Sequence, residues 1–240
     1  MAGARAGAQV GCCGFPVARA KYFENFEVVE LQSTFYQLPK EGTPERWRAA
    51  APEGFEFTVK VPQLITHEAS SPTYRKLKEK LAPEARKRVG SFRPTEEVFS
   101  AWERTLTLCR RLKARVALFQ SPPSFRPTPE HKKNLKTFFG TIERGGLTLI
   151  WEPRGSWQEE EVLELCRELG LVHGVDPFTS KPLWGEPRYF RLHGRGGYRH
   201  KYSDEELKEL KEMLGEAGGA YVLFNNVFMF EDAQRFKRLL

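Results

Sequence analysis

Eight short apolar runs recur along the 240 residues, and each ends in a polar or chemically useful side chain. The runs cover residues 9–13, 28–32, 55–60, 115–120, 147–152, 171–176, 188–193 and 220–225. Segments with helical periodicity separate them, and this alternation favours a parallel sheet closed on itself. Strands that are apolar for most of their length, with chemistry at their C-terminal ends, are typical of a (β/α)8 barrel. We therefore expect one TIM-type (β/α)8 barrel domain, an α/β fold, over residues 1–240.

The composition and the cysteines indicate the class of protein and its compartment. The chain is 40% hydrophobic and 29% charged, and no apolar stretch approaches the roughly 20 residues that span a bilayer. Residues 1–9 lack the apolar centre of a secretory signal. Cys12, Cys13, Cys109 and Cys166 form neither a C-x-x-C pair nor a zinc-like spacing, which predicts buried thiols in a cytoplasmic protein. As an alternative, Cys12 ends the first strand and could act as a nucleophile at the barrel mouth.

Helical signals lie between the strands. Residues 94–113 place apolar side chains on one face at a period near 3.6, which predicts a helix packed on the barrel. Ser156 is a candidate N-cap for the helix that follows it, and Ser203 with Glu206 forms a candidate capping box. Residues 128–139 and 231–240 complete the late helices.

One connection is unusually long. Residues 62–93 separate the third strand from the helix expected before the fourth, and Pro72, Pro83 and Pro94 divide this segment into short pieces. Loops of this length are usually lids, binding loops or disordered segments. We expect a small helical lid whose positive charge guides an anionic ligand inward. A surface insertion without function is the alternative.

The two-residue period of strands predicts which side chains face the barrel interior. Glu152 shares a face with Ile150 and Thr148, whereas Trp151 lies on the face that suits the helix layer. The same count gives one inward face, polar near the top of the barrel, that carries Glu30, Lys60, Gln120, His193 and Asn225. Asp176 ends the sixth run. The sequence therefore predicts a polar mouth at the C-terminal ends of the strands.

The charged residues at this mouth are compatible with three kinds of partner. Three carboxylates, Glu30, Glu152 and Asp176, face three cations, Lys60, Arg154 and Arg191, with His67 and His193 nearby. Isolated buried charges are costly, so these groups must pair with one another, with a ligand or with a metal. A purely structural ion-pair network satisfies this condition.

The surplus of hydrogen-bond donors at the mouth favours an anionic ligand. Lys60, Arg154 and Arg191 can hold a phosphate or a carboxylate, and the glycine-containing loop after the seventh strand adds backbone N–H groups. A divalent metal is the weaker alternative, with Glu152, Asp176 and His193 as its ligands, because the nearby cations oppose it. No cofactor is predicted.

Seven motifs carry a family resemblance over nearly the whole chain. They are GCCGF (11–15), ELQSTFY (30–36), KVPQLITH (60–67), FQSPPSF (119–125), WEPRGSW (151–157), RLHG (191–194) and FNN (224–226). In this order they resemble the YecE-like family, also called domain of unknown function 72. Two departures stand out. Cys12 and Cys13 replace the usual Thr-Ser, and Gln32 replaces Asn, which puts in doubt any role for a hydroxyl on the first strand.

The resemblance implies a TIM-type barrel near the xylose-isomerase and apurinic-endonuclease barrels, without a settled activity. The motif residues map onto Glu30, Ser33, Tyr36, Lys60, Thr66, His67, Gln120, Glu152, Arg154, Trp157, Asp176, Arg191, His193 and Asn225. Nearly all of them lie at the ends of the apolar runs or in the loops that follow.

Two functions from different classes remain. The first is a hydrolase or lyase acting on a phosphorylated or other anionic substrate, of phosphoester type by analogy with the fold. Its catalytic candidates are Glu30, Glu152, Asp176 and His193, and its substrate contacts are Lys60, His67, Gln120, Arg154, Arg191, Asn225, Tyr36, Trp157 and Tyr198.

The second function is a non-catalytic nucleic-acid-binding barrel. The net charge is +7, with basic runs at residues 74–88, 110–115 and 191–201, although solvated helix faces explain the first two runs equally well. The aromatic residues Tyr36, Phe125, Trp157, Trp184 and Tyr198 would stack on bases. The sequence specifies neither the substrate nor the oligomeric state.

Overall fold

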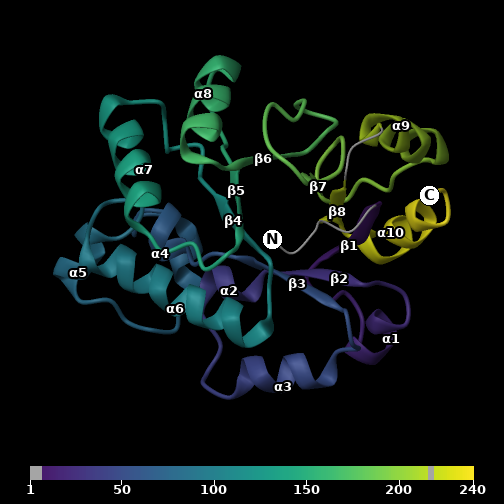
Figure 1. Ribbon diagram of the computed structural model, residues 1–240, viewed down its shortest axis with the longest axis horizontal. Coiled ribbons are helices and arrows are strands. Elements are labelled where there is room, and N and C mark those ends of the chain that lie inside the picture. Colours follow the sequence, from purple (N-terminus) through teal and green to yellow (C-terminus); the bar gives the residue numbers. More distant parts are fainter. Residues whose placement is uncertain (1–6, 216–218) are drawn as a thin grey trace.

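Eight parallel strands close into a barrel in the computed structural model, which describes residues 7–215 and 219–240 (Figure 1). The strands are β1 (Ala8–Cys13), β2 (Val28–Leu31), β3 (Glu56–Lys60), β4 (Val116–Gln120), β5 (Thr148–Glu152), β6 (Val172–Val175), β7 (Arg188–Leu192) and β8 (Ala220–Phe224). They follow one another in sequence order, and β8 pairs with β1 to close the sheet. The predicted (β/α)8 barrel is confirmed. Residues 1–6, part of the stretch expected to lack a secretory signal, lie outside the described residues.

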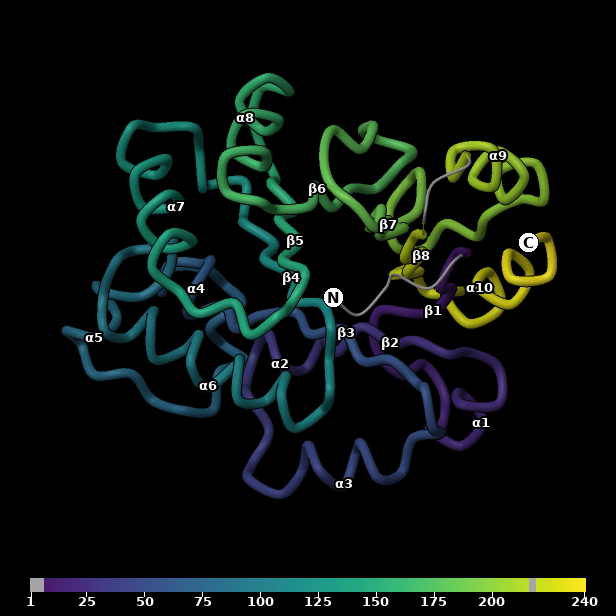
Figure 2. Tube along the Cα trace, in the orientation of Figure 1, coloured from purple at the N-terminus to yellow at the C-terminus, as the bar shows by residue number. Residues whose placement is uncertain are grey.

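The helices form an outer ring around the strands (Figures 1 and 2). They are α1 (Arg19–Phe23), α2 (Ser33–Tyr36), α3 (Thr43–Ala50), α4 (Gln63–Thr66), α5 (Pro83–Arg88), α6 (Glu96–Leu112), α7 (Pro129–Thr141), α8 (Glu159–Leu169), α9 (Asp204–Leu214) and α10 (Met229–Lys237), with the 3-10 helix η1 (Pro72–Lys76). None of these helices is both long and apolar enough to cross a membrane.

Helix caps agree with the sequence at α9 and differ at α8. Ser203 and Glu206 form the predicted capping box at the start of α9. At α8 the prediction of Ser156 as N-cap was wrong. The cap is Gln158, two residues further along the chain. Its side chain accepts a hydrogen bond from the backbone N–H of Glu161, and the side chain of Glu161 accepts one from the backbone N–H of Gln158.

The strand parity predicted from the sequence is confirmed. A cluster made only of strand residues fills the barrel interior and contains Cys13, Val28, Val116, Leu118, Ile150, Val172, Tyr189, Tyr221 and Leu223. Trp151 and Leu149 belong instead to a cluster shared with the surrounding helices. The inward face of β5 is therefore the one that carries Glu152.

Cys12 does not reach the mouth. Its side chain belongs to the outer cluster, and its Sγ lies 3.4 Å from the carbonyl oxygen of Met229. Burial raises the pKa of the Cys12 thiol far above its ordinary value. The next residue, Cys13, faces the interior, and burial and the nearby Glu30 carboxylate raise its pKa as well. Neither thiol has the electropositive, exposed surroundings of a reactive cysteine.

The long connection is helical, as expected. Residues 62–93 hold α4, η1 and α5, and they pack against α2 and α6 at one side of the barrel, with α5 at the outer edge (Figure 1). Its basic residues form several ion pairs, including Arg88 with Glu97 and Arg93 with Glu68. The segment forms part of the rim beside β3 and β4, and its role as a lid stays a prediction.

Gly11 allows β1 and β2 to approach closely, which gives a first testable prediction. A Cβ atom at this position would lie 2.2 Å from the backbone carbonyl oxygen of Val28. Since backbone must move to relieve this clash, we expect Gly11→Ala to lower the free energy of unfolding by roughly 3 kcal/mol, measured with urea. Gly140→Ala is the matched control. It lies in α7 with nothing within 4 Å of the new Cβ, and should gain about 0.5–1 kcal/mol. Equal stabilities for the two variants would contradict the prediction.

Candidate active site at the barrel mouth

Arg191 lies at the centre of a buried ionic layer that crosses the barrel. β7 directs its fully buried side chain inward, where Nε and Nη2 donate to Glu30 at 3.0 and 2.8 Å. Its Nη1 donates to Oε2 of Glu152 at 2.6 Å. Because Glu30 comes from β2 and Glu152 from β5, one guanidinium joins three strands. Every nitrogen of Arg191 is engaged, so this side chain is held by the protein itself.

Glu152 is the junction between this layer and the mouth above it. Its Oε2 accepts from Arg191, while Oε1 accepts from Arg154 and, at 3.2 Å, from Nε2 of Gln120. Burial alone would raise the pKa of Glu152, but Arg191 and Arg154 outweigh burial and lower the pKa to about 2. Glu152 is therefore a carboxylate at neutral pH and serves to hold cations in place.

Lys60 is a buried cation with neutral partners. Its Nζ donates to Oε1 of Gln120 at 2.6 Å and lies 4.3 Å from the centre of the Phe35 ring. In the described part of the chain, no carboxylate forms an ion pair with it within 4.0 Å. Burial, together with the nearby charge of Arg191, lowers the pKa of Lys60 to about 8.

His193 is fixed between an acid and two guanidinium groups. Oδ2 of Asp176 accepts from the backbone N–H of His193 at 2.8 Å and lies 3.4 Å from its Nδ1. On the other side of the ring, Nε2 lies 2.9 Å from Nη2 of Arg154 and 3.4 Å from Nη1 of Arg191. A guanidinium can only donate, so Nε2 is the acceptor and Nδ1 carries the proton toward Asp176. Nη2 of Arg154 also lies 3.5 Å from Nδ1, so this guanidinium contacts the ring near both nitrogens.

The predicted metal ligands do not fit a resident divalent ion. Nε2 of His193 and both oxygens of Glu152 face guanidinium groups, so the donors that a metal needs are already paired with cations. Across residues 7–215 and 219–240, no group of three His, Cys, Asp or Glu is arranged to hold a metal ion. The chemistry of this site is accordingly derived from the side chains alone.

His67 lies at the edge of the mouth and is held in its neutral form. Its Nδ1 is 2.8 Å from Oγ1 of Thr66, and its ring packs edge-on against Phe35. Burial and the nearby charge of Lys60 lower the pKa of His67 to about 3. The residue also lines a cavity of roughly 440 Å³ that η1 and the loop 122–124 enclose. This cavity opens the rim on the β3 and β4 side.

The remaining predicted contacts divide between the rim and the packed interior. Asn225 is half-buried at the end of β8, and Tyr198, 59% exposed, has its ring 6.0 Å from that of His193. Tyr36 is half-buried beneath a lysine ammonium group. Trp157 packs against buried aromatic rings and donates its indole N–H to a backbone carbonyl at 2.7 Å. The structure thus places Asn225 and Tyr198 near the polar network and gives Trp157 a packing role.

Comparison with known proteins shows the family of this chain. The family model described as "Protein of unknown function DUF72" matches residues 18–240. The chain belongs to the DUF72 family. A curated relative is UPF0759 protein YunF of Bacillus subtilis (strain 168). It is 26% identical to this chain over an alignment of 258 residues, which covers 91% of this chain and 84% of YunF. The resemblance found in the seven motifs is therefore confirmed.

Solved structures support the barrel of this DUF72 protein. A DUF72 family protein from Enterococcus faecalis V583 superposes with a TM-score of 0.73 at 22% identity and covers 98% of each chain. A xylose isomerase domain protein from Planctomyces limnophilus matches with a TM-score of 0.59 at 11% identity, covering 100% of this chain and 96% of its own. At these identities the likeness concerns the fold alone.

Three residues of the DUF72 site were missed by sequence reasoning. Tyr189 donates its hydroxyl to Oε2 of Glu30 at 2.7 Å, Gln32 also donates to Glu30, and Phe35 lies against Lys60. Strand parity places Tyr189 on the same inward face as Arg191, two residues before it, but did not indicate its contact with Glu30. Gln32 and Phe35 both fall inside the ELQSTFY motif, but their direction depends on α2, which the sequence did not predict.

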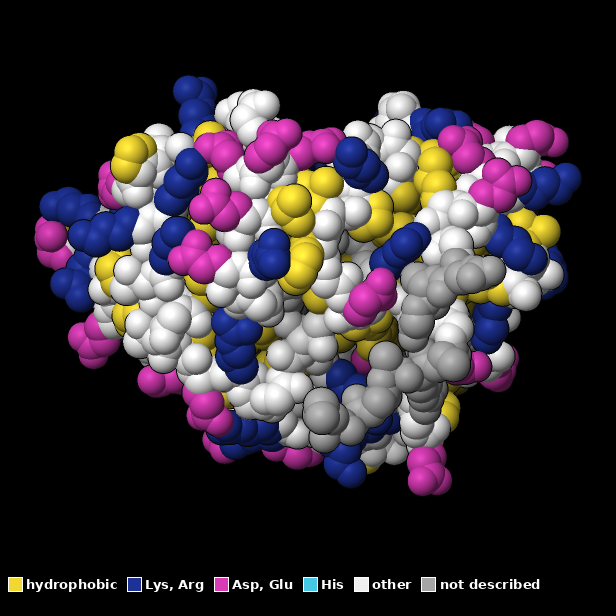
Figure 3. Space-filling model, turned by 45° about the horizontal axis from the view of Figure 1, so that its top comes forward, with side chains coloured by type: hydrophobic (Ala, Val, Ile, Leu, Met, Phe, Trp, Pro, Cys, Tyr) yellow, Lys and Arg dark blue, Asp and Glu magenta, His cyan; other side chains and the backbone are white. Residues whose placement is uncertain are grey.

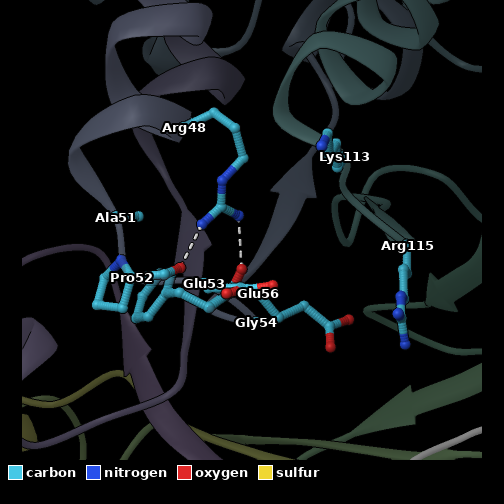
Figure 4. Close-up of a pocket in the computed structure, with 9 residues that line it drawn as sticks. Arg48, Ala51, Pro52, Glu53, Gly54, Glu56, Lys113 and Arg115 are labelled. Carbon is cyan, nitrogen blue, oxygen red and sulfur yellow. Dashed lines mark hydrogen bonds between the residues drawn. The ribbon is translucent and has the colours of Figure 1, made fainter.

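A second cavity lies at the opposite end of the barrel. It has a volume of roughly 430 Å³ and is lined by Arg48, Lys113 and Arg115 at the N-terminal ends of β3 and β4 (Figure 4). Arg48 donates to the carbonyl oxygens of Phe55 and Pro52 at 2.6 and 2.8 Å. In barrels of this type the N-terminal face serves stability, so this cavity is not the candidate active site.

The DUF72 protein should lose stability on mild acidification because His67 is held neutral. The pKa of His67 falls from 6.5 to about 3 on folding, so between these values the unfolded chain binds a proton that the folded chain does not. Stability is therefore complete above pH 6.5 and falls as the pH is lowered toward 3. From pH 7 to pH 4, His67 should account for a loss on the order of 3 kcal/mol.

Urea unfolding at the two pH values measures this loss. Between pH 7 and pH 4, the free energy of unfolding should fall less in His67→Gln than in the wild type, by on the order of 3 kcal/mol. His131→Gln is the matched histidine control and should keep the pH dependence of the wild type. An unchanged pH dependence in His67→Gln would refute the assignment.

Proposed function

We propose that this DUF72 protein is an enzyme of the hydrolase or lyase class that acts on a small phosphorylated or carboxylated substrate at the barrel mouth. The observation that carries the proposal is a pair of cations with unused donors, Lys60 and Arg154. Nε of Arg154 is buried without a hydrogen-bond partner, and Nζ of Lys60 donates to a single side-chain oxygen. Unpaired buried donors cost free energy, and an anionic ligand would relieve this cost.

The two cations lie on either side of one bridging pair. Lys60 donates to Gln120, which donates to Glu152, which accepts from Arg154. Arg191 lies beneath these residues, and each of its nitrogens already donates to Glu30 or Glu152. We therefore assign substrate binding to Lys60 and Arg154, and assign Arg191 and Glu30 to the support beneath them.

His193 is the proton carrier in this proposal. Its Nε2 accepts from Arg154 in the present arrangement, so an anion that draws Arg154 toward itself would free the imidazole lone pair. Asp176 fixes the ring and its tautomer through Nδ1. Glu152 stays a carboxylate and orients Arg154. Contacts to the rest of the substrate would come from the rim, where His67, Asn225 and Tyr198 lie.

A nucleic-acid partner has less support from the geometry. Phe125 is buried and Trp157 is packed against it, so neither ring is available to stack on a base. Of the five aromatic residues considered, Trp184 and Tyr198 are the exposed ones. On the face shown in Figure 3, basic and acidic side chains are interspersed. The four free, buried cysteines suit the cytoplasm, which is the compartment we propose.

Inorganic phosphate is the simplest probe of the site. At ten times its Kd, phosphate should add about 1.4 kcal/mol to the free energy of unfolding, which corresponds to a rise in Tm of roughly 3–6 °C for a chain of this size. Arg154→Ala should abolish the rise. Arg46→Ala, on the exposed face of α3, should retain it.

Two results would count against the proposal. One is a phosphate effect of equal size in Arg154→Ala and Arg46→Ala, because the ion would then bind elsewhere. The other is tight binding of single-stranded DNA or RNA that weakens steeply with salt, since that behaviour belongs to the nucleic-acid-binding alternative.

A further inference from the structure

Lys60 differs from the other two cations of the mouth in the charge of its partners. Arg191 contacts the carboxylates of Glu30 and Glu152, and Arg154 contacts Glu152. Lys60 contacts the amide oxygen of Gln120 and the face of the Phe35 ring, although only 7% of its surface is exposed. A buried ammonium without a carboxylate partner is costly, whereas a neutral amine in the same place is not.

The surroundings of Lys60 therefore increase the fraction of neutral amine: burial and the charge of Arg191 lower the pKa, and the carboxylates of Glu30 and Glu152 only partly oppose this shift. With a pKa of about 8, about half of the amine is unprotonated near pH 8, compared with well under one part in a hundred for an ordinary lysine. Desolvation and a neighbouring cation, here Arg191, are the two means by which proteins activate an amine as a nucleophile. Gln120 accepts one N–H and so orients the nitrogen in the mouth.

We propose that Lys60 is a nucleophile that forms an imine with an anionic aldehyde or ketone whose charged group is held by Arg154. This inference rests on the proposed function for the anion contact and deepens it by naming the substrate as a carbonyl compound. The amine nitrogen bonds to the carbonyl carbon, and a proton passes from nitrogen to the carbonyl oxygen to give a carbinolamine. The hydroxyl group then takes up a second proton and leaves as water, with a C=N bond in its place.

Imine formation favours a lyase reaction over a hydrolase reaction, the two classes proposed above. A protonated imine accepts the electron pair of a neighbouring C–C or C–H bond as that bond breaks, which a hydrolase does not require. The Phe35 ring, already 4.3 Å from Nζ, would stabilise the positive charge of the iminium ion. His193, which Asp176 orients, would accept or return the proton at the neighbouring atom.

Pyridoxal 5′-phosphate, an aldehyde with a phosphate group, is the probe that tests this inference. The full chain is treated with the probe, reduced with borohydride to lock the imine, digested, and mapped by mass spectrometry. We expect an adduct on Lys60 whose rate of formation rises with pH with a midpoint near pH 8. Arg154→Ala should lower the rate of labelling at Lys60 about tenfold, because the phosphate is no longer held.

Two variants check the identity of the labelled residue. Lys60→Arg should lose the adduct on that peptide, while Lys76→Arg, at an exposed lysine of η1, should retain it. Mapping of the wild-type chain does not depend on whether Lys60→Arg folds. Labelling confined to exposed lysines would overturn the inference, as would a Lys60 rate that rises only near pH 10.

The same variants separate this inference from the function on which it rests. If phosphate stabilises the protein through Arg154 and Lys60 is not labelled, the imine is refuted and the anion site stands. If phosphate gives no Arg154-dependent stabilisation and Lys60 is labelled at the same rate in Arg154→Ala, the anion site is refuted, and with it the anionic carbonyl substrate proposed here.

Discussion

Replacement of Arg191 by Met is expected to lower the free energy of unfolding by about 3–5 kcal/mol. The guanidinium is fully buried and pairs with two buried carboxylates, Glu30 and Glu152. Without it, both carboxylates remain in the interior with their largest neutralising charge gone. Urea unfolding at pH 7 measures the loss. Arg195→Met is the matched control, since Arg195 is an exposed arginine in the loop after β7, four residues further on, and pairs with Glu209. This variant should lose no more than about 1 kcal/mol.

A double variant tests the cause of this loss. If the loss comes from the uncompensated charge of Glu30, then Arg191→Met combined with Glu30→Gln should be more stable than the sum of the single effects by at least about 1 kcal/mol. Additive effects, or a loss below 1 kcal/mol in Arg191→Met alone, would show that the ionic layer does not stabilise the barrel.

Replacement of His193 by Gln is expected to lower kcat about 10²- to 10⁴-fold, the usual contribution of a positioned acid or base. Glutamine can keep a hydrogen bond to Arg154 but cannot carry a proton between substrate and solvent. A phosphorylated aldehyde or ketone that the wild type converts is the appropriate substrate. KM should change little, because the contact proposed to hold the anion belongs to Arg154.

Two controls make the His193 result specific. His131→Gln, in α7 on the outside of the barrel, should leave kcat unchanged, and phosphate should still raise the Tm of His193→Gln. A variant that retains full kcat would remove His193 from the mechanism. A variant that loses phosphate stabilisation as well would indicate that the imidazole positions Arg154.

The sequence predicted the barrel and its inward face because both depend on local patterns. Alternation within each strand decided that Glu152, His193 and Gln120 face inward, and each apolar run is long enough for that alternation to be counted. The seven motifs then identified the same strand ends. At β1 the pattern was ambiguous, because Cys12 and Cys13 are adjacent and only one of them can face the interior.

Pairing among the charges could not be predicted. The sequence placed Arg191 with Lys60 and Arg154 as a substrate contact, since all three are cations at strand ends. Only the three-dimensional arrangement shows that Arg191 donates its hydrogen bonds to Glu30 and Glu152, which are distant from it in sequence. The same arrangement leaves Lys60 with neutral partners.

The layer formed by Glu30, Arg191 and Glu152 also limits how deep a substrate can enter. Because it crosses the interior from β2 to β7 and β5, it forms a solid floor, and a ligand must lie entirely between that floor and the loops. In the proposed site, the loops above this floor would then decide which anions fit. Replacement of residues in the loop after β7 is therefore expected to alter which anion binds at the mouth while the ionic layer beneath it stays intact.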